Sequence, residues 1–370
     1  MINCHTHIFN EDHVPEHFIS PILIGLSNLL ENGKVTAALE AACIAVGKEG
    51  WAEQVARKHQ FITVGREKKP EWRMLQDLLI PAYPADTKFI VLSMDMEYMQ
   101  GGASQRSYLQ QLEDLTLLKR TPNYGPLIYP FVAADPRRPG LLELVRSKIE
   151  EDHFYGIKIY PPLGYFPFDE RLFPVFEYAQ EHEIPVMSHC SRGGIFYHGF
   201  VQKRHPRTGV KIPGQSNNRR TEGFTDPSNY QYVLERFPNL KICLAHWGGQ
   251  AEWKKLSDRL AEPPPIEMPP TWPEVINDLL RNSAYPHVYT DISFTLYDTV
   301  TCLPLLNSWL GINAIKNNVL FGSDYYMELQ NKSEPDFLSG VRNGISAADL
   351  ELISDTNAKN YLRSRVHRDV

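Results

Sequence analysis

The chain has 370 residues, of which 42% are hydrophobic and 22% are charged, as expected for a globular protein with a full core. A net charge of −6 and the lack of any Lys- or Arg-rich run argue against a nucleic-acid binder, which would carry a basic patch. No run approaches the ~20 apolar residues that cross a bilayer, and the five scattered cysteines lack CxxC spacing. We therefore expect a cytoplasmic protein without membrane or nucleic-acid partners.

Short apolar runs of strand length recur along the chain and alternate with helical patterns. The eight predicted strands are 1–7, 89–94, 127–133, 156–160, 185–189, 241–246, 288–293 and 319–324. Apolar residues at helical spacing lie between most of them, as at Leu141, Val145 and Ile149. Strands that alternate with helices form a parallel sheet, and eight of them predict an α/β fold, the (β/α)8 or TIM barrel.

Three stretches are longer than a minimal barrel needs. Residues 8–87 carry several helical patterns and predict a helical insertion after the first strand. Residues 190–225 are rich in Gly, Arg, Asn and aromatic residues, which is typical of a lid or binding loop. A proline-rich connector over 262–270 precedes a helix expected to start near Pro273. No internal repeat is evident, so residues 1–370 are expected to form a single barrel domain that includes the insertion.

Two histidines close the first predicted strand. His5 and His7 are two residues apart, so on a strand both imidazoles project to the same side. That geometry suits two ligands of one metal ion. The alternative is that either ring is simply packed or solvated.

Further polar residues close other predicted strands. His189 ends the fifth strand, His246 the sixth and Asp324 the eighth. Active sites of TIM barrels gather at the carboxyl ends of the strands. Each residue alone could be a strand-end cap or a core histidine, but their joint occurrence favours a shared metal site.

These motifs carry a family resemblance. The sequence resembles the amidohydrolase superfamily and, within it, the amidohydrolase-2 group of metal-dependent hydrolases that includes aminocarboxymuconate semialdehyde decarboxylase. The matching segments are His5-Thr6-His7, Ser188-His189, Ala245-His246-Trp247-Gly248-Gly249, Phe321-Gly322-Ser323-Asp324 and the closing residues 356–362. Each segment is weakly specific, but their order along nearly the whole chain is quite specific.

The resemblance implies one divalent ion held by His5, His7, His189 and Asp324. Zinc is the expected ion, with manganese or iron as alternatives, and it would lower the pKa of its bound water to ~7. Asp324 would act as the general base. His246 would transfer a proton or polarise the substrate carbonyl, and it would become a ligand if a second ion were present.

Four residues are candidates for contact with a small-molecule substrate. Lys158 ends the fourth strand, where some superfamily members carry a carboxylated lysine that bridges two metals; a cation for an anionic substrate and a structural ion pair are the alternatives. Arg192 could grip a carboxylate with its planar guanidinium, or lie on an exposed loop. Tyr160 and Trp247 are expected near the barrel mouth, where they suggest a flat apolar substrate, although both could be packing residues.

Three functions are compatible with this site. The first is a hydrolase that attacks a small, anionic amide, ester or lactone, and the second is a non-oxidative decarboxylase of a small aromatic or unsaturated acid. The third is an inactive barrel that binds a ligand. The arginines after the first strand, Arg57, Arg66 and Arg73, match no decarboxylase motif, which favours hydrolysis. The complete ligand set argues against an inactive barrel, and a homodimer is left open.

Overall fold

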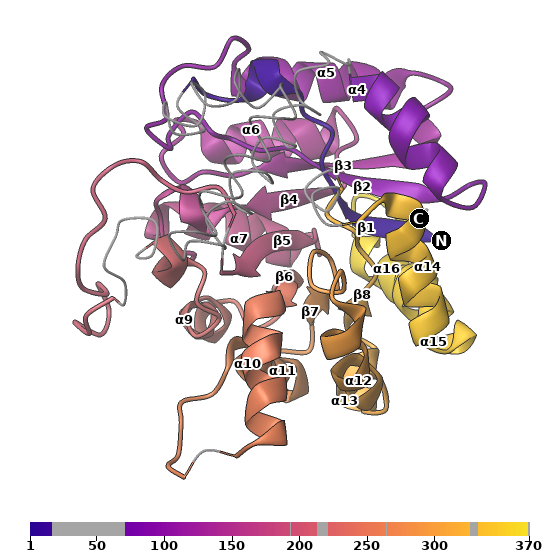
Figure 1. Ribbon diagram of the computed structural model, residues 1–370. Coiled ribbons are helices and arrows are strands. Elements are labelled where there is room, and N and C mark those ends of the chain that lie inside the picture. The colour runs from indigo at the N-terminus through magenta and orange to yellow at the C-terminus, as the bar shows by residue number, and fades with distance from the viewer. Residues whose placement is uncertain (17–70, 193, 213–220, 264, 326–331, 369–370) are drawn as a thin grey trace, which may run out of the picture.

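The computed structural model describes residues 1–16, 71–192, 194–212, 221–263, 265–325 and 332–368. Eight parallel strands lie side by side in chain order in one sheet (Figure 1). They are β1 (Ile2–Thr6), β2 (Lys88–Leu92), β3 (Ile128–Ala133), β4 (Gly156–Ile159), β5 (Val186–Ser191), β6 (Ile242–Gly248), β7 (Val288–Asp291) and β8 (Val319–Leu320). All eight overlap the predicted strands, and the predicted TIM-barrel fold is confirmed.

Backbone hydrogen bonds bring the last strand against the first. The N–H of Cys4 donates to the carbonyl of Phe321 at 2.8 Å, and the N–H of His7 donates to the carbonyl of Tyr325 at 2.6 Å. Thr6 and Tyr325 form a parallel bridge. The sheet therefore forms a nearly closed barrel, and the carboxyl ends of β1 and β8 lie next to each other.

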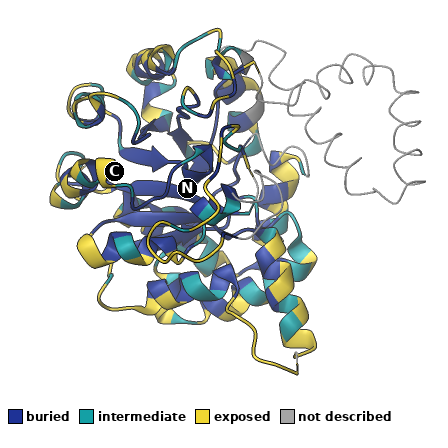
Figure 2. Ribbon diagram, turned by 90° about the vertical axis from the view of Figure 1, so that its left-hand side faces the viewer, coloured by how far each residue is buried: buried dark blue, intermediate teal, exposed yellow. Residues whose placement is uncertain are grey.

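Helices surround the barrel, with their buried faces toward the strands and their exposed faces outward (Figure 2). They are α4 (Glu71–Arg73), α5 (Tyr108–Arg120), α6 (Leu141–Glu150), α7 (Phe173–Glu181), α9 (Asn229–Arg236), α10 (Gln250–Ala261), α11 (Trp272–Arg281), α12 (Thr299–Leu310), α13 (Asn313–Lys316), α14 (Glu334–Gly344), α15 (Ala347–Glu351) and α16 (Asn357–Leu362). Helical turns include η1 (Glu11–His13), η2 (Met74–Leu79), η3 (Ile80–Ala82), η4 (Gly125–Leu127), η5 (Pro161–Leu163), η6 (Glu170–Leu172), η7 (Glu222–Phe224) and η9 (Leu352–Thr356).

The start of α11 shows how local sequence fixes one of these helices. Thr271 and Glu274 form a capping box, in which the Glu274 carboxylate accepts the N–H and the hydroxyl of Thr271 at 2.7 Å, and Pro273 lies in the first turn. Ile276 and Leu280 are buried on one face. The predicted start near Pro273 is confirmed, since the helix begins at Trp272.

The insertion after β1 is only partly covered. Residues 17–70 lie outside the described residues, and the remainder of 8–87 contributes η1, α4, η2 and η3. Within the predicted 190–225 loop, the described part holds η7 and a short antiparallel bridge between Arg204 and Lys211. Across the part of the chain that the structure covers, no helix has the length and apolar character to span a membrane.

Candidate metal centre

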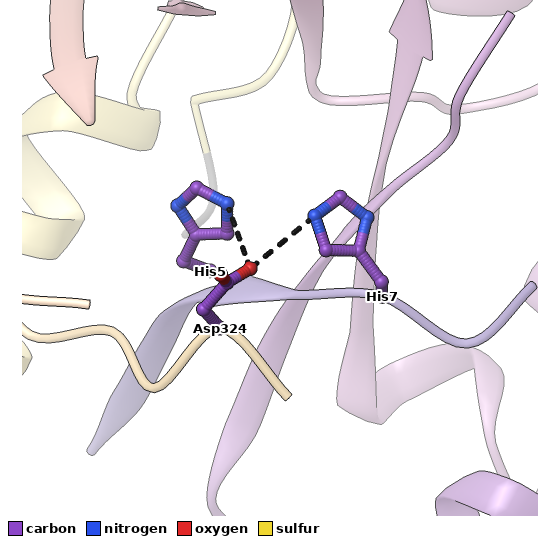
Figure 3. A group of neighbouring side chains, drawn as sticks. All are labelled: His5, His7 and Asp324. Atoms are coloured by element: carbon purple, nitrogen blue, oxygen red, sulfur yellow. Dashed lines mark ion pairs between the residues drawn. The ribbon is translucent and has the colours of Figure 1, made fainter. Parts of the chain in front are cut away.

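The ends of β1 and β8 bring three ionisable side chains together. The Nε2 atoms of His5 and His7 each lie 3.5 Å from Oδ1 of Asp324. Figure 3 shows both rings directed at this one carboxylate oxygen. All three residues are buried, with 0%, 4% and 6% of their surfaces exposed. The predicted grouping of these three residues is thus present in the structure.

An irregularity in β1 aims His5 into this group. The pairing of β1 with β2 shifts between Asn3 and Thr6, and such irregularities re-aim side chains next to active sites. The Asn3 side chain holds the distorted backbone, because its Oδ1 accepts the N–H of both His5 and Ser323 at 3.2 Å. Its Nδ2 donates to Ser323 and to Tyr83. Asn3 thereby fixes the position of His5 relative to the residue before Asp324.

Close backbone contact also holds Asp324 in place. Asp324 has a positive φ of 64°, which is uncommon for a residue other than glycine, and its N–H donates to the His5 carbonyl at 2.9 Å. A Cβ on Gly322 would lie 2.8 Å from Cβ of His5. Glycine is therefore needed at position 322 for β8 to approach β1 this closely.

The Nδ1 atoms of His5 and His7 both have hydrogen-bond partners. Nδ1 of His7 donates to the Leu92 carbonyl at 3.0 Å, and Nδ1 of His5 lies 2.9 Å from Oδ2 of Asp291. Burial, with Lys158 adding to it, lowers the pKa of His7 to about 3 and holds the pKa of His5 well below its ordinary value. Both rings are neutral at pH 7, and their Nε2 lone pairs face Asp324. A hydrogen bond on Nδ1, with Nε2 directed into the site, is a usual arrangement of a metal-ligating histidine.

Asp291, at the end of β7, is a site residue that the sequence reasoning missed. Its Oδ2 holds His5, while its Oδ1 accepts the N–H of His246 at 2.9 Å and the N–H of Ser293 at 3.0 Å. It is completely buried. The one signal in the sequence is its position, because Asp291 ends an apolar strand.

His189 and His246 form a second pair beside the first group. Nδ1 of His189 lies 3.1 Å from Nε2 of His246, and Nδ1 of His246 lies 2.9 Å from the Ser293 hydroxyl. The His5 and His246 rings are 4.7 Å apart between centroids. Among the described residues, the compact groups containing His5 are His5–His7–Asp324 and His5–His246–Asp291, and His189 belongs to neither. The structure thus places His189 against His246 on one ring nitrogen and against the Ser191 hydroxyl, at 3.1 Å, on the other.

Lys158 and Tyr160 lie beside the histidines. Lys158 is fully buried at the end of β4, with Nζ 3.5 Å from Nε2 of His5. Burial lowers the pKa of Lys158 to about 8, and the nearby Asp324 and Asp291 act in the opposite direction. The Tyr160 ring stacks on His189 at 4.3 Å, and its hydroxyl accepts the N–H of Ile195 at 3.1 Å. Both predicted residues therefore lie within reach of the histidines.

Arg192 is held by acidic residues. Its Nε donates to Glu252 at 2.6 Å, its Nη1 lies 3.3 Å from Glu222, and its guanidinium stacks on Trp272. These ion pairs use Nε and Nη1, and a grip on a substrate carboxylate through the other donors of the guanidinium stays a prediction.

Trp247 is directed away from the histidines. Its ring is fully buried against Trp253 and Trp309, and its Nε1 donates to Asn277 of α11 at 2.9 Å. The side chain belongs to the core between the barrel and its helices, which argues against the substrate contact predicted for it. Although Trp247 follows a site histidine in the sequence, burial of its large apolar indole in the core decides where the side chain points.

The distances in the first group fit a metal ion. A separation of 3.5 Å is beyond the ~3.2 Å usual for a hydrogen bond. Two atoms bound at ~2.0–2.2 Å to one tetrahedral ion lie about 3.3–3.6 Å apart, which is the separation found from both histidines to Asp324. Neutral imidazoles and a carboxylate are ligands that zinc and manganese accept. The residues present thus fit a divalent ion.

Fold and site together define a TIM barrel with a histidine–aspartate group, suited to a metal ion, at the carboxyl ends of its strands. The family model described as amidohydrolase matches residues 2–363. The chain belongs to the amidohydrolase family, and the predicted resemblance is confirmed.

Solved structures of the same fold cover almost the whole chain. An amidohydrolase from Burkholderia multivorans with bound zinc has 14% identity and a TM-score of 0.57, covering 97% of this chain and 98% of its own. An uncharacterized TIM-barrel protein from Bordetella bronchiseptica has 16% identity and a TM-score of 0.52, covering 98% of both chains. The 5-carboxyvanillate decarboxylase from Novosphingobium aromaticivorans, complexed with manganese, has 14% identity and a TM-score of 0.51, covering 98% and 96%. No curated protein matches the chain.

Proposed function

We propose that this protein is a metal-dependent hydrolase that cleaves a small, anionic amide, ester or lactone. The observation that carries the proposal is the convergence of two neutral histidines on Asp324 at 3.5 Å, a spacing suited to shared ion coordination. His5, His7 and Asp324 would hold the ion, with His189 as the fourth ligand. Zinc is the proposed ion, in line with the zinc-bound Burkholderia amidohydrolase.

A divalent ion in such a site supplies a hydroxide nucleophile near neutral pH, because it lowers the pKa of water to ~7. Asp324 lies at the centre of the group and can take the nucleophile's proton and return it to the leaving group. Burial, with Asp291 and Glu334 adding to it, raises the pKa of the Asp324 carboxyl, whereas Lys158 acts against the rise. A basic carboxylate is a better proton acceptor, which suits this role.

The histidine pair would act on the substrate. His246 is anchored on its Nδ1 side by Ser293, so its Nε2 atom, 3.1 Å from His189, faces the site. With His189 as a ligand of the ion, Nε2 of His246 would be available to polarise a carbonyl or pass a proton. Lys158 supplies a positive charge next to His5, which favours an anionic substrate.

Replacing Asp291 with asparagine is expected to weaken zinc binding about 10- to 100-fold, the usual effect of removing a residue that orients a metal ligand. The amide keeps the shape but lacks the charge that holds Nδ1 of His5 at 2.9 Å. Zinc titration of the chelator-treated protein measures this change. Asp258→Asn, at an exposed aspartate of α10, is the matched control. Equal affinities in Asp291→Asn and wild type would show that Asp291 does not orient a ligand.

The reaction is tested with metal-loaded protein and a panel of small carboxylic acids, amides, esters and lactones. We expect turnover of an amide, ester or lactone, complete loss of turnover with chelator, and recovery with zinc. Release of CO2 from an aromatic or unsaturated acid would show a decarboxylase instead. Metal-free protein with an intact fold and no turnover would indicate a barrel that only binds a ligand.

A further inference from the structure

A second group of potential metal ligands lies away from the strand ends, between the loop after β1 and the helical layer. It consists of His13 in η1, Glu71 at the start of α4 and Asp114 in α5. Nδ1 of His13 lies 3.6 Å from Oε1 of Glu71, and Nε2 of His13 lies 3.5 Å from Oδ2 of Asp114. One ligand atom from each residue lies within 4.8 Å of the other two. The proposed catalytic site uses none of these residues.

His13 has a buried ring nitrogen that bears on whether this group binds an ion. Its side chain is only 1% exposed, and its Nε2 atom is buried without a hydrogen-bond partner. A buried polar nitrogen left without a partner costs free energy, so its presence calls for an explanation. The nearest acceptor, the Asp114 carboxylate, is too far for a good hydrogen bond but at the distance of a second ligand on a common ion.

Among the described residues, acidic side chains outnumber basic ones in the contacts of this cluster. Glu71 and Asp114 contact its ring, and Asp12 is close enough to act on both His13 and Glu71. Arg106, which donates to Asp114 at 2.6 Å, is the positive group that the described structure places in contact with this cluster. Burial, followed by the charges of Asp114 and Asp12, raises the pKa of Glu71 to about 7. Two carboxylates beside a buried imidazole favour either bound protons or a cation.

The surrounding contacts orient the three side chains. Arg106 holds both oxygens of Asp114 through one nitrogen, Nη2, and each carboxylate oxygen has a further lone pair. Nδ2 of Asn10 donates to Oε1 of Glu71 at 3.0 Å. An ion on Nε2 of His13 would place the ring proton on Nδ1, and the 3.3 Å contact from the Asn10 N–H to Nδ1 would then be given up.

We infer that His13, Glu71 and Asp114 bind a second, structural divalent ion of the zinc or manganese class. One nitrogen and carboxylate oxygens suit these ions better than calcium, which takes oxygen ligands only. His13 and Glu71 lie on either side of residues 17–70 in the sequence, and Asp114 lies on α5. The ion would therefore join the two chain segments that flank this stretch to the helical layer of the barrel.

The test is a zinc titration of the chelator-treated full-length protein by calorimetry. We expect His13→Asn to bind one equivalent of zinc fewer than wild type, and Asp114→Asn to bind that equivalent at least ten-fold more weakly. His153→Asn is the matched control, because His153 is exposed and its φ of 57° suits asparagine. His7→Ala should lose zinc at the strand ends and keep it at His13, which separates the two sites.

Equal zinc stoichiometry in wild type and His13→Asn would overturn the inference and indicate a protonated cluster instead. If either variant fails to fold, as judged by circular dichroism, zinc-soaked crystals of wild type decide the question. An anomalous peak between His13 and Asp114 is expected. Its absence, with both side chains ordered, would equally overturn the inference.

Discussion

Replacing Asp324 with asparagine is expected to lower kcat/KM by about 10³-fold, within the range contributed by a positioned general base. Asparagine keeps an oxygen that can contact the ion but cannot accept a proton. The backbone N–H of residue 324 can still donate to His5, and asparagine tolerates the positive φ of 64°, so the fold should persist. Steady-state kinetics on a substrate from the panel, with metal content measured in parallel, tests this expectation.

The control for this variant is again Asp258→Asn, which changes the same chemical group on an exposed face of α10. Turnover in Asp324→Asn within ten-fold of wild type, at equal metal content, would exclude Asp324 as the general base. A loss of turnover that simply follows a loss of metal would leave Asp324 as a ligand only.

Replacing His246 with asparagine is expected to keep the wild-type metal content and lower kcat by about 10²-fold or more. The reason is that His246 lies beside the His5–His7–Asp324 group rather than in it, anchored by Ser293 on one nitrogen and facing His189 with the other. Metal analysis and kinetics of the same preparation provide both readouts.

Nδ1 of His189 and Nε2 of His246, 3.1 Å apart, would need to separate only slightly for both nitrogens to bind one ion. A drop of one metal equivalent in His246→Asn would therefore show that His246 is a ligand and that the strand ends hold two ions. Unchanged kcat would instead remove His246 from the chemistry altogether.

The strands and most of the site were predictable because both depend on local sequence. Buried parallel strands appear as continuous apolar runs, and a polar residue that ends such a run lies at the carboxyl face of the barrel. This reasoning placed His5, His7 and Asp324 together. It did not identify Asp291, because the strand was predicted to run to residue 293 whereas β7 ends at Asp291.

The features of the site that could not be predicted depend on contacts between segments that are distant in the sequence. The irregularity of β1 at Asn3 is held by Ser323 and Tyr83, which no local pattern links to it. Trp247 follows a site histidine but turns into the core between α10 and α12, where Trp253 and Trp309 pack against it. The cluster at His13 joins three segments far apart in sequence. Spacing within one segment cannot reveal such pairings.

The most direct test of the central claim is an anomalous difference map from crystals of the full-length protein grown with zinc, collected on both sides of the zinc absorption edge. We predict a strong peak ~2.0–2.2 Å from Nε2 of His5, Nε2 of His7 and Oδ1 of Asp324. Ordered side chains at these positions with no peak among them would contradict it.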